Sequence, residues 1–288
     1  MSGKQLIRLV VIFAVLLLVW GAAALARRSG GAKAGGDALG LPAIDRFKVD
    51  TVVMVKGRDT TVLARQDSST WLVNGQRAAR GEVADLLVAL SDSSRRSELV
   101  AEEKASQAAL GTDSTGTRAR VVAGGTTVAE LVAGHQSSDF SGGYLRKAGD
   151  EATYLVRGRL AELLNRGAEE WRDHRIAAVP PDSIGKIEVS RGGRSYSIER
   201  VDKRWKLSRG TADSARAAEL AGAFRDVQAT GFASPAEAGS AEFARPDRTV
   251  TLARKDGTPI VKLLFDSTKA GFWVKTDTGT TVYRVEAY

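Results

Sequence analysis

The sequence predicts an α+β protein in which an N-terminal transmembrane helix precedes two tandem β-β-β-α-β-β-β-β repeats with mainly antiparallel sheets. Three observations lead to this fold class: an uncharged apolar run near the start of the chain, two tryptophans that each precede an amphipathic helical pattern, and short β-branched runs separated by glycine turns. The chain has 288 residues, of which 43% are hydrophobic and 26% are charged. This composition suits one or two globular domains with an additional segment.

The apolar run extends from Leu9 to Ala26 without a charged residue. A helix needs about 20 apolar residues to cross a bilayer core of about 30 Å, and the run is close to that length. Trp20 lies near its far end, where interfacial aromatic residues are typical. We therefore predict a transmembrane anchor over residues 1–28. Because Ala24-Leu25-Ala26 also matches the A-x-A pattern of a cleavage site, a cleaved signal peptide is the alternative.

Residues 29–43 begin with SGGAKAGGDALG, which is dominated by glycine and other small residues. Such a segment cannot bury enough apolar surface to fold by itself. We therefore expect a flexible linker between the anchor and the folded part of the chain.

Trp71 and Trp205 mark an internal duplication. Each is followed, at the same interval, by apolar residues with the i, i+3, i+4, i+7 spacing of a helix that buries one face. We expect both tryptophans to pack in the core between sheet and helix rather than to stack on a ligand. The predicted helical stripes are Val83, Leu86, Leu87 and Leu90 in the first copy, and Ala217, Leu220, Ala221 and Phe224 in the second.

Runs typical of strands precede and follow each helical pattern, with glycine-containing turns between them. Long crossovers are few, so the sheets should be mainly antiparallel. Tyr144 and Tyr154 have the same spacing as Trp273 and Tyr283, and we expect the two rings of each pair to share one sheet face. The expected strands are 51–55, 60–65, 118–123, 128–133, 144–146 and 154–156 in the first copy, and 186–189, 195–200, 249–254, 260–265, 273–275 and 283–285 in the second, with a further strand starting at each tryptophan.

These patterns place the first α+β repeat at residues 44–157 and the second at residues 181–288. The intervening residues 158–180 carry apolar positions at helical spacing and end at Pro180-Pro181. We therefore expect a connecting helical segment that joins the two repeats.

The sequence contains no recognisable catalytic, cofactor-binding or metal-binding constellation. It has no cysteine, which excludes disulfides, thiolate metal sites and cysteine nucleophiles. The two histidines, His135 and His174, are far apart, and neither has a second histidine at the spacing of a zinc site. Nucleotide-binding glycine motifs and the G-x-S-x-G nucleophile elbow are also missing. We therefore expect a protein that is not an enzyme and that uses no cofactor.

The net charge is +8, and basic residues gather around the hairpin expected in the second repeat. This cluster could contact lipid phosphates or an anionic polymer. Alternatively, the charges guard an edge strand against pairing with another chain. Aromatic residues make up only 6% of the chain, which argues against a stacking surface for nucleic acid. The candidate anionic-ligand patch comprises Arg194, Arg200, Lys203, Arg204, Lys206 and Arg209.

The order of these motifs resembles a bacterial family catalogued as domain of unknown function 4340. The similarity covers residues 44–288, and the proline that follows the helix in the family pattern is present at Pro246 but has no counterpart after Gly111. The shared motifs are an N-terminal helix, a tryptophan strand before an amphipathic helix, the strands Tyr154-Leu155-Val156 and Tyr283-Arg284-Val285, and the connector Trp171-Arg172-Asp173-His174-Arg175.

The resemblance implies membrane-anchored accessory proteins that are often encoded beside ABC transporter subunits, and it implies no catalytic residues. We accordingly expect a single-pass protein of the cytoplasmic membrane with its soluble part on the extracytoplasmic side. The expected function is that of a non-enzymatic accessory or scaffold protein of the cell envelope that partners an ABC transporter complex. The alternatives are a binding module for an anionic envelope polymer or lipid headgroup, and an unrecognised hydrolase.

Overall fold

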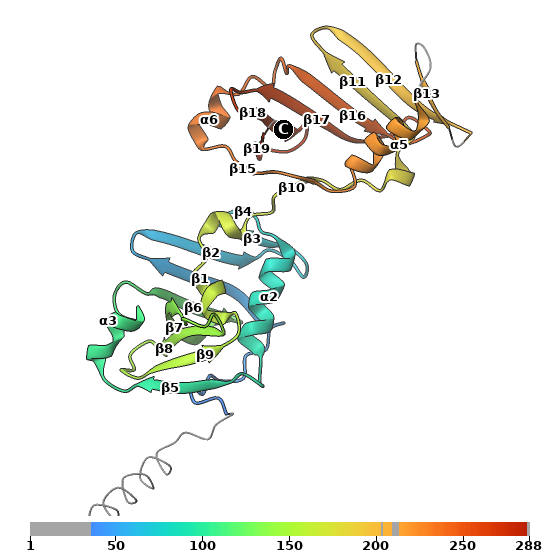
Figure 1. The fold of residues 1–288 in the computed structure, drawn as a ribbon. Coiled ribbons are helices and arrows are strands. Elements are labelled where there is room, and N and C mark those ends of the chain that lie inside the picture. The colour runs from blue at the N-terminus through green and yellow to red at the C-terminus, as the bar shows by residue number, and fades with distance from the viewer. Residues whose placement is uncertain (1–35, 203, 209–212, 287–288) are drawn as a thin grey trace, which may run out of the picture. The chain divides into compact units, whose positions relative to one another are not determined.

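The computed structural model describes residues 36–202, 204–208 and 213–286. These residues form two compact units, the first ending at Asp173 and the second beginning at His174 (Figure 1). Each unit is built around one large antiparallel sheet with a few short helices. The sheet-rich α+β class predicted from the sequence is therefore confirmed.

In the described part of unit 1, a nine-stranded sheet has the order β4-β3-β2-β1-β6-β7-β8-β9-β5. Its strands show the period of two that one buried face requires, because Val52 and Met54 of β1 are buried while Val53 and Val55 are half-buried on the opposite face. The strands are β1 (Val49–Lys56), β2 (Asp59–Arg65), β3 (Trp71–Val73), β4 (Gln76–Arg77), β5 (Ser97–Ala101), β6 (Thr117–Ala123), β7 (Thr126–Gln136), β8 (Gly142–Lys147) and β9 (Thr153–Arg157).

Helices complete the core of unit 1. Helix α2 (Arg80–Ser91) buries Val83, Leu86 and Leu90 in the same cluster as the inward residues of the sheet. Trp171, which is 0% exposed, joins this cluster from a 3-10 helix, so the helical part of the expected connector 158–180 belongs to unit 1. The short helices of this unit are η1 (Lys104–Ser106), α3 (Gln107–Leu110), α4 (Leu160–Leu164) and η2 (Ala168–Trp171).

In the described part of unit 2, an eight-stranded sheet has the order β13-β12-β11-β16-β17-β18-β19-β15, and β10 pairs with β14 beside it. The strands are β10 (Arg175–Ala177), β11 (Lys186–Arg191), β12 (Arg194–Val201), β13 (Arg204–Leu207), β14 (Val227–Gln228), β15 (Gly231–Phe232), β16 (Arg248–Ala253), β17 (Pro259–Ser267), β18 (Gly271–Thr276) and β19 (Tyr283–Glu286). The helices are η3 (Pro181–Ser183), α5 (Ser214–Ala223) and α6 (Pro235–Ser240).

Apart from β4, the strands of the unit 1 sheet correspond one by one to those of the unit 2 sheet in the described residues. The order β3-β2-β1-β6-β7-β8-β9-β5 in unit 1 matches the order in unit 2, and a helix follows the tryptophan strand in both. Trp71 and Trp205 are each 6% exposed and lie in the core of their own unit, which confirms the prediction that they pack between sheet and helix. The edge strands β5 and β15, which come after the helix and pair with β9 and β19, were not predicted.

The expectation that each aromatic pair shares a sheet face is wrong. Tyr144 lies opposite Leu155, one residue beyond Tyr154, so the two tyrosines point to opposite faces of the hairpin. The same one-residue offset separates Trp273 from Tyr283. Because a shift of one residue in an antiparallel pair changes the face, the spacing of the two rings could not determine it without the register.

The predicted apolar stripe of the second helix is wrong at one position. Leu220 is 39% exposed, whereas Leu86 at the corresponding place in α2 is fully buried. Helix α5 instead buries Ala217 and Ala221, which lie one turn apart. The buried stripe of α5 is therefore narrower than the sequence spacing indicated.

The structure also corrects the predicted linker 29–43, because residues 36–43, which are the described part of it, are docked on unit 1. Asp37 Oδ1 accepts a hydrogen bond from Ser97 Oγ at 2.6 Å, and the same hydroxyl accepts one from the backbone N–H of Leu39 at 2.8 Å. Leu39 is only 1% exposed and belongs to the core of unit 1. The buried leucine, these hydrogen bonds, the backbone pairing with Ser97 and the Arg95–Asp37 ion pair hold a segment that composition alone assigns to a linker.

The predicted anchor over residues 1–28 lies outside the residues that the structure describes. Among the residues that are described, no helix combines the length and the apolar character needed to span a membrane.

Candidate functional site

The basic patch predicted for the second repeat is not one surface. Arg200 lies opposite Trp205 and therefore on the inward face of the sheet. Arg194 lies an even number of residues from Arg200 on β12, so its side chain points to the same face. Arg204 and Lys206 on β13 alternate with Trp205 and point to the other face. The remaining two members of the patch, Lys203 and Arg209, lie outside the described residues.

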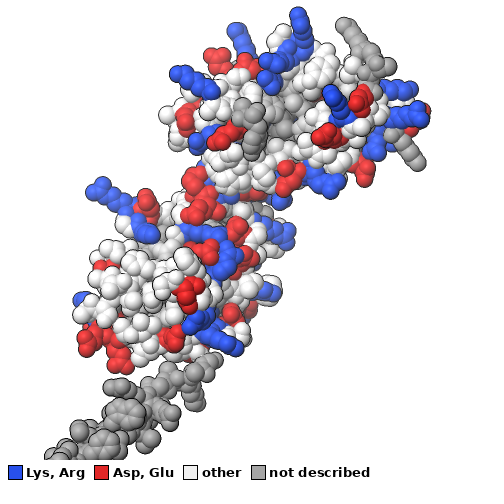
Figure 2. All heavy atoms as spheres, viewed as in Figure 1, with Lys and Arg blue, Asp and Glu red and all other residues white. Residues whose placement is uncertain are grey.

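Carboxylates neutralise part of this basic region. Arg200 Nη1 is 3.5 Å from Asp182 Oδ1, whereas Glu199, which lies opposite Lys206 in the sheet, pairs with Lys186 at 3.3 Å. Figure 2 shows acidic side chains interspersed among basic ones on the visible face of each unit. The described members of the patch therefore do not converge on one anion.

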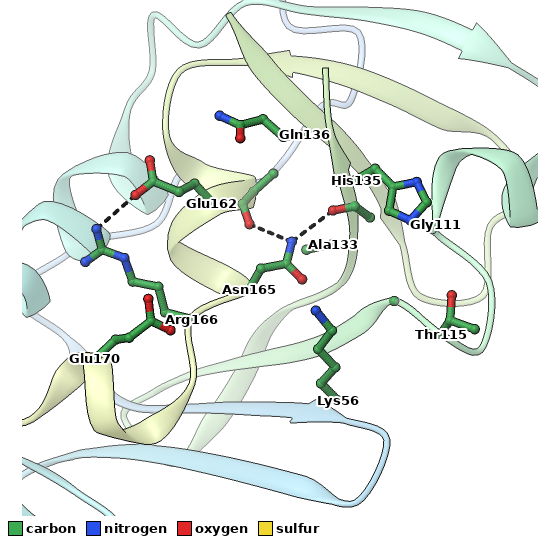
Figure 3. Close-up of a pocket in the computed structure, with 13 residues that line it drawn as sticks. Lys56, Gly111, Thr115, Ala133, His135, Gln136, Glu162, Asn165, Arg166 and Glu170 are labelled. Atoms are coloured by element: carbon green, nitrogen blue, oxygen red, sulfur yellow. Dashed lines mark hydrogen bonds and ion pairs between the residues drawn. The ribbon is translucent and has the colours of Figure 1, made fainter. Parts of the chain in front are cut away.

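The structure instead reveals a polar cavity of about 600 Å³ in unit 1, which the sequence did not predict. Four segments build its wall: the end of β1, the loop after α3, the end of β7, and the α4–η2 segment (Figure 3). The lining residues are Lys56, Gly111, Thr115, Gly116, Ala133, Gly134, His135, Gln136, Ala161, Glu162, Asn165, Arg166 and Glu170.

Glycines allow the loop after α3 to pack directly on β7. A Cβ on Gly134 would collide with the carbonyl oxygen of Leu110 and would lie 2.7 Å from Thr112 Cγ2. Gly111 has φ +67°, and a Cβ there would lie 2.6 Å from the ring of His135. The register of β7 with β8 also shifts in this region, so the strand bulges where the cavity forms.

Asn165 fixes the position of the bulged strand relative to α4. Its Nδ2 donates hydrogen bonds to the carbonyl oxygens of Gly134 and Ala161, both at 2.9 Å (Figure 3). Its Oδ1 accepts a hydrogen bond from Thr117 Oγ1 at 2.6 Å. Both donors of the amide and its oxygen are thus used for structure, and Asn165 is a positioning residue of the cavity wall.

The two carboxylates of the cavity are also engaged in structural contacts. Glu162 Oε1 is 2.9 Å from Arg166 Nη2, and Arg159 donates two hydrogen bonds to the same carboxylate, at 3.1 and 3.2 Å. The hydrogen bond from Arg159, followed by that from Arg166, holds the pKa of Glu162 below its ordinary value. Glu170 Oε2 accepts a hydrogen bond from the backbone N–H of Gly167 at 2.8 Å and so caps η2. The lowered pKa of Glu162 is the opposite of the raised pKa that a general acid needs.

Three polar side chains of the cavity are available to a ligand. Lys56, His135 and Gln136 are exposed, and within the described part of the chain no hydrogen bond or ion pair engages their side-chain nitrogens or oxygens. An ammonium, an imidazole and an amide in the lining of one cavity suit a ligand with hydrogen-bond acceptors or a negative charge.

Among the described residues, no cluster of metal ligands accompanies this cavity. Across the described ranges 36–202, 204–208 and 213–286, no three side chains of the histidine, aspartate and glutamate type come together as metal ligands. His135 and His174 lie in different units, in agreement with their separation in the sequence.

The fold and the site define a sheet-rich α+β protein with two topologically equivalent units and a polar cavity in the first. The family model described as Domain of unknown function (DUF4340) matches residues 71–246, which is more than half of the chain, and the chain belongs to this family. The match starts at β3 of unit 1 and ends before β16 of unit 2, so it spans parts of both units. No curated protein and no solved structure matches the chain.

Proposed function

We propose that this chain is a membrane-anchored, non-enzymatic accessory or scaffold protein of the cell envelope that binds a protein partner, with an ABC transporter complex as that partner. Two tandem modules with one strand order are proposed to be copies of a single binding fold. The apolar run Leu9–Ala26 supports the anchor and the position at the cytoplasmic membrane, with the modules on the extracytoplasmic side. The observation that carries the proposal is a chemical difference between the two sheets.

The two sheets differ on the face that points away from the core. In unit 1, Val53 lies opposite Val62 on this outward face, and both are half-buried. At the corresponding place in unit 2, Glu188 lies opposite Ser197. The neighbouring inward pair is apolar and buried in both units, which establishes the correspondence.

The fold does not require the valines of the outward face, because unit 2 builds the same hairpin with a glutamate and a serine there. The two valines of unit 1 present apolar surface on the outward face, and burial of this surface against a partner would be favourable. Arg120 lies opposite Val53 on the other side and pairs with Glu130 at 2.6 Å. An apolar centre beside a charged pair is the composition typical of a protein-protein interface.

The chemistry of the cavity supports binding rather than catalysis. Glu162 and Glu170 are held by arginines and by a backbone N–H, and Asn165 is fully hydrogen-bonded within the wall. These groups shape the cavity, and the three available side chains can hold a ligand without an activated nucleophile beside them.

The test is affinity purification of the tagged full-length chain in mild detergent, followed by mass spectrometry. The variant Val53→Glu/Val62→Ser carries the residues that unit 2 has at these positions, so it should fold. The matched control, Glu188→Gln/Ser197→Ala, makes two changes on the corresponding face of unit 2.

We expect the wild-type chain and the control to recover ABC transporter subunits and the Val53→Glu/Val62→Ser variant to lose them. Recovery of the wild-type chain without any membrane partner would contradict the accessory role. A chain trimmed at Ala26 would contradict the anchor and would favour a secreted binding module. Equal recovery by the variant and the wild type would show that the outward face of unit 1 is not the binding surface.

A further inference from the structure

We propose that a groove in unit 1 binds a peptide segment of a partner protein in which an apolar side chain is flanked by carboxylates. The proposal rests on the proposed function only in that the peptide belongs to a protein partner. The groove lies between the residues that precede β1, the β2–β3 loop and the first turns of α2. We call it the arginine groove and define it by Arg46, Phe47, Arg65, Trp71, Arg80 and Val88.

The groove has an apolar floor and an apolar rim. Trp71 and Val83, which are 6% and 1% exposed, form the floor. Phe47 and Val88 form the rim and are 74% and 50% exposed. A phenylalanine with most of its surface in water next to a concave apolar site is a candidate contact for an apolar side chain of another molecule.

The charge of the groove is positive. Its lining contains three arginines and, among the described residues, no carboxylate. Arg65 is fixed in place, because its Nε and Nη2 donate to backbone carbonyl oxygens at 2.9 and 3.0 Å and its guanidinium lies 5.0 Å from the centre of the Trp71 ring. Arg46 and Arg80 are exposed, and no described carboxylate forms an ion pair with either.

Two carboxylates close to the groove in the sequence, Asp45 and Asp67, do not line it. Asp45 accepts a hydrogen bond from the backbone N–H of Phe47 at 3.0 Å and lies 3.9 Å from Lys48 Nζ. Asp67 accepts hydrogen bonds from the backbone N–H groups of Ser69 and Thr70 at 2.7 and 2.8 Å, and it closes the β2–β3 loop. Carboxylates of a partner would therefore face Arg80 and Arg46, whose guanidinium lies 4.9 Å from the centre of the Phe47 ring. Neither arginine is paired with a described carboxylate, so both can form charge-assisted hydrogen bonds with a partner.

The size and shape of the groove select a peptide over the other anionic candidates. Its volume is about 230 Å³, below the range of about 300–1,000 Å³ that is usual for small-molecule pockets. The space is suited to an inserted side chain. A bilayer surface is flat and cannot fill a concave floor that includes Trp71, so a membrane is the weaker candidate for the same combination of arginine and phenylalanine.

Because the chain has no cysteine, Ser68→Cys introduces a single thiol, and this thiol lies in the lining of the groove. A fluorescent label on it reports binding in the groove. The probes are three synthetic heptapeptide pools: acidic flanks around an apolar pair, basic flanks around an apolar pair, and acidic flanks around a serine pair. With the labelled full-length chain in detergent, we expect a saturable blue shift of an environment-sensitive dye with the first pool only. No saturable response to that pool, or an equal response to the basic pool, would overturn the proposal.

Two variants and one control assign the response to the groove. Arg46→Glu/Arg80→Glu and Phe47→Ser alter exposed side chains, so both should melt like the wild type, and each should weaken binding about tenfold or more. Arg58→Glu makes the same kind of charge reversal at the exposed β1–β2 turn and should leave binding unchanged. Unchanged binding by both groove variants would contradict the proposal.

A membrane contact and a failure of the proposed function give different results. A blue shift on transfer of the labelled chain to phosphatidylglycerol nanodiscs without peptide, lost in Phe47→Ser, would assign the groove to the membrane and overturn the peptide proposal. If the wild-type chain recovers transporter subunits and Arg46→Glu/Arg80→Glu recovers them equally, the groove proposal fails while the accessory role stands. If peptides bind but no partner is recovered, the accessory role fails and the groove proposal stands.

Discussion

The substitution Arg95→Met tests how the segment that precedes β1 is held on unit 1. The Arg95 side chain is only 5% exposed. Its Nη2 donates hydrogen bonds to the carbonyl oxygens of Ala89 and Leu90 at 3.0 and 2.9 Å. These carbonyls lie in the last turn of α2, where the helix itself supplies no N–H donor. Its Nη1 lies 3.3 Å from Asp37 Oδ2. Methionine keeps the apolar stem and removes all three contacts.

The expected cost follows from these contacts. A hydrogen bond from a charged donor contributes about 1.5–3 kcal/mol, and the desolvation of the buried guanidinium offsets part of the sum. We therefore expect Arg95→Met to lower the free energy of unfolding of unit 1 by about 3 kcal/mol. For a unit of this size, that corresponds to a fall of about 10 °C in its melting temperature. Differential scanning calorimetry of the full-length chain measures the change, and unit 2 should melt as before.

A double-mutant cycle tests the reasoning. Asp37→Ala leaves a buried guanidinium without its carboxylate and should cost about 2 kcal/mol. In the Arg95→Met background the same change should cost about 1 kcal/mol less, since no charge is left unpaired. Arg58→Met, at an exposed turn, is the control and should stay within about 0.5 kcal/mol of the wild type. If the costs of Arg95→Met and Asp37→Ala add to within about 0.3 kcal/mol in the double variant, the Arg95–Asp37 ion pair does not hold the segment on unit 1.

Three further predictions concern the two cores and the cavity. Gly134→Ala should destabilise unit 1 by at least about 2 kcal/mol in thermal unfolding, because its Cβ meets a backbone carbonyl, whereas Gly81→Ala in open space on α2 should be stabilising by about 0.5–1 kcal/mol. Glu162 contributes stability above its ordinary pKa of 4.5, because Arg159 lowers its folded-state pKa, and this contribution is lost as the pH falls. The melting temperature of unit 1 should therefore depend less on pH in Glu162→Gln than in the wild type between about pH 5 and pH 3. Trp205→Ala should cost about 3–5 kcal/mol in denaturant unfolding of unit 2 and should leave unit 1 unchanged.

The strands and the core tryptophans could be predicted because their signals are local. A strand that buries one face alternates every second residue, as β1 does, and this pattern is visible in the sequence. Strand β5 gives no such signal, because its central residues Leu99 and Val100 are 39% and 45% exposed. Strand β15 has two residues, which is too short for any period to show.

The register and the cavity depend on contacts that are distant in the sequence. The spacing of Tyr144 and Tyr154 identified a hairpin but not its register, so the predicted face was wrong by one residue. The cavity brings Lys56, His135 and Asn165 together from three separate segments. A glycine inside a strand, such as Gly134, indicates a bulge or a close backbone approach, and it is the one sequence feature that could have marked the place.

If the chain is anchored in a membrane as proposed, the docking of Asp37 would limit the distance between unit 1 and the bilayer. If the anchor is the proposed segment 1–28, about nine residues lead from its end to Asp37, and a fully extended chain of that length spans no more than about 32 Å. A linker that ran on to residue 43 would permit about 20 Å more. In a chain anchored as proposed, the hydrogen bond between Ser97 and Asp37 would shorten the tether, and unit 1 would reach only those parts of a membrane complex that lie within this distance of the bilayer.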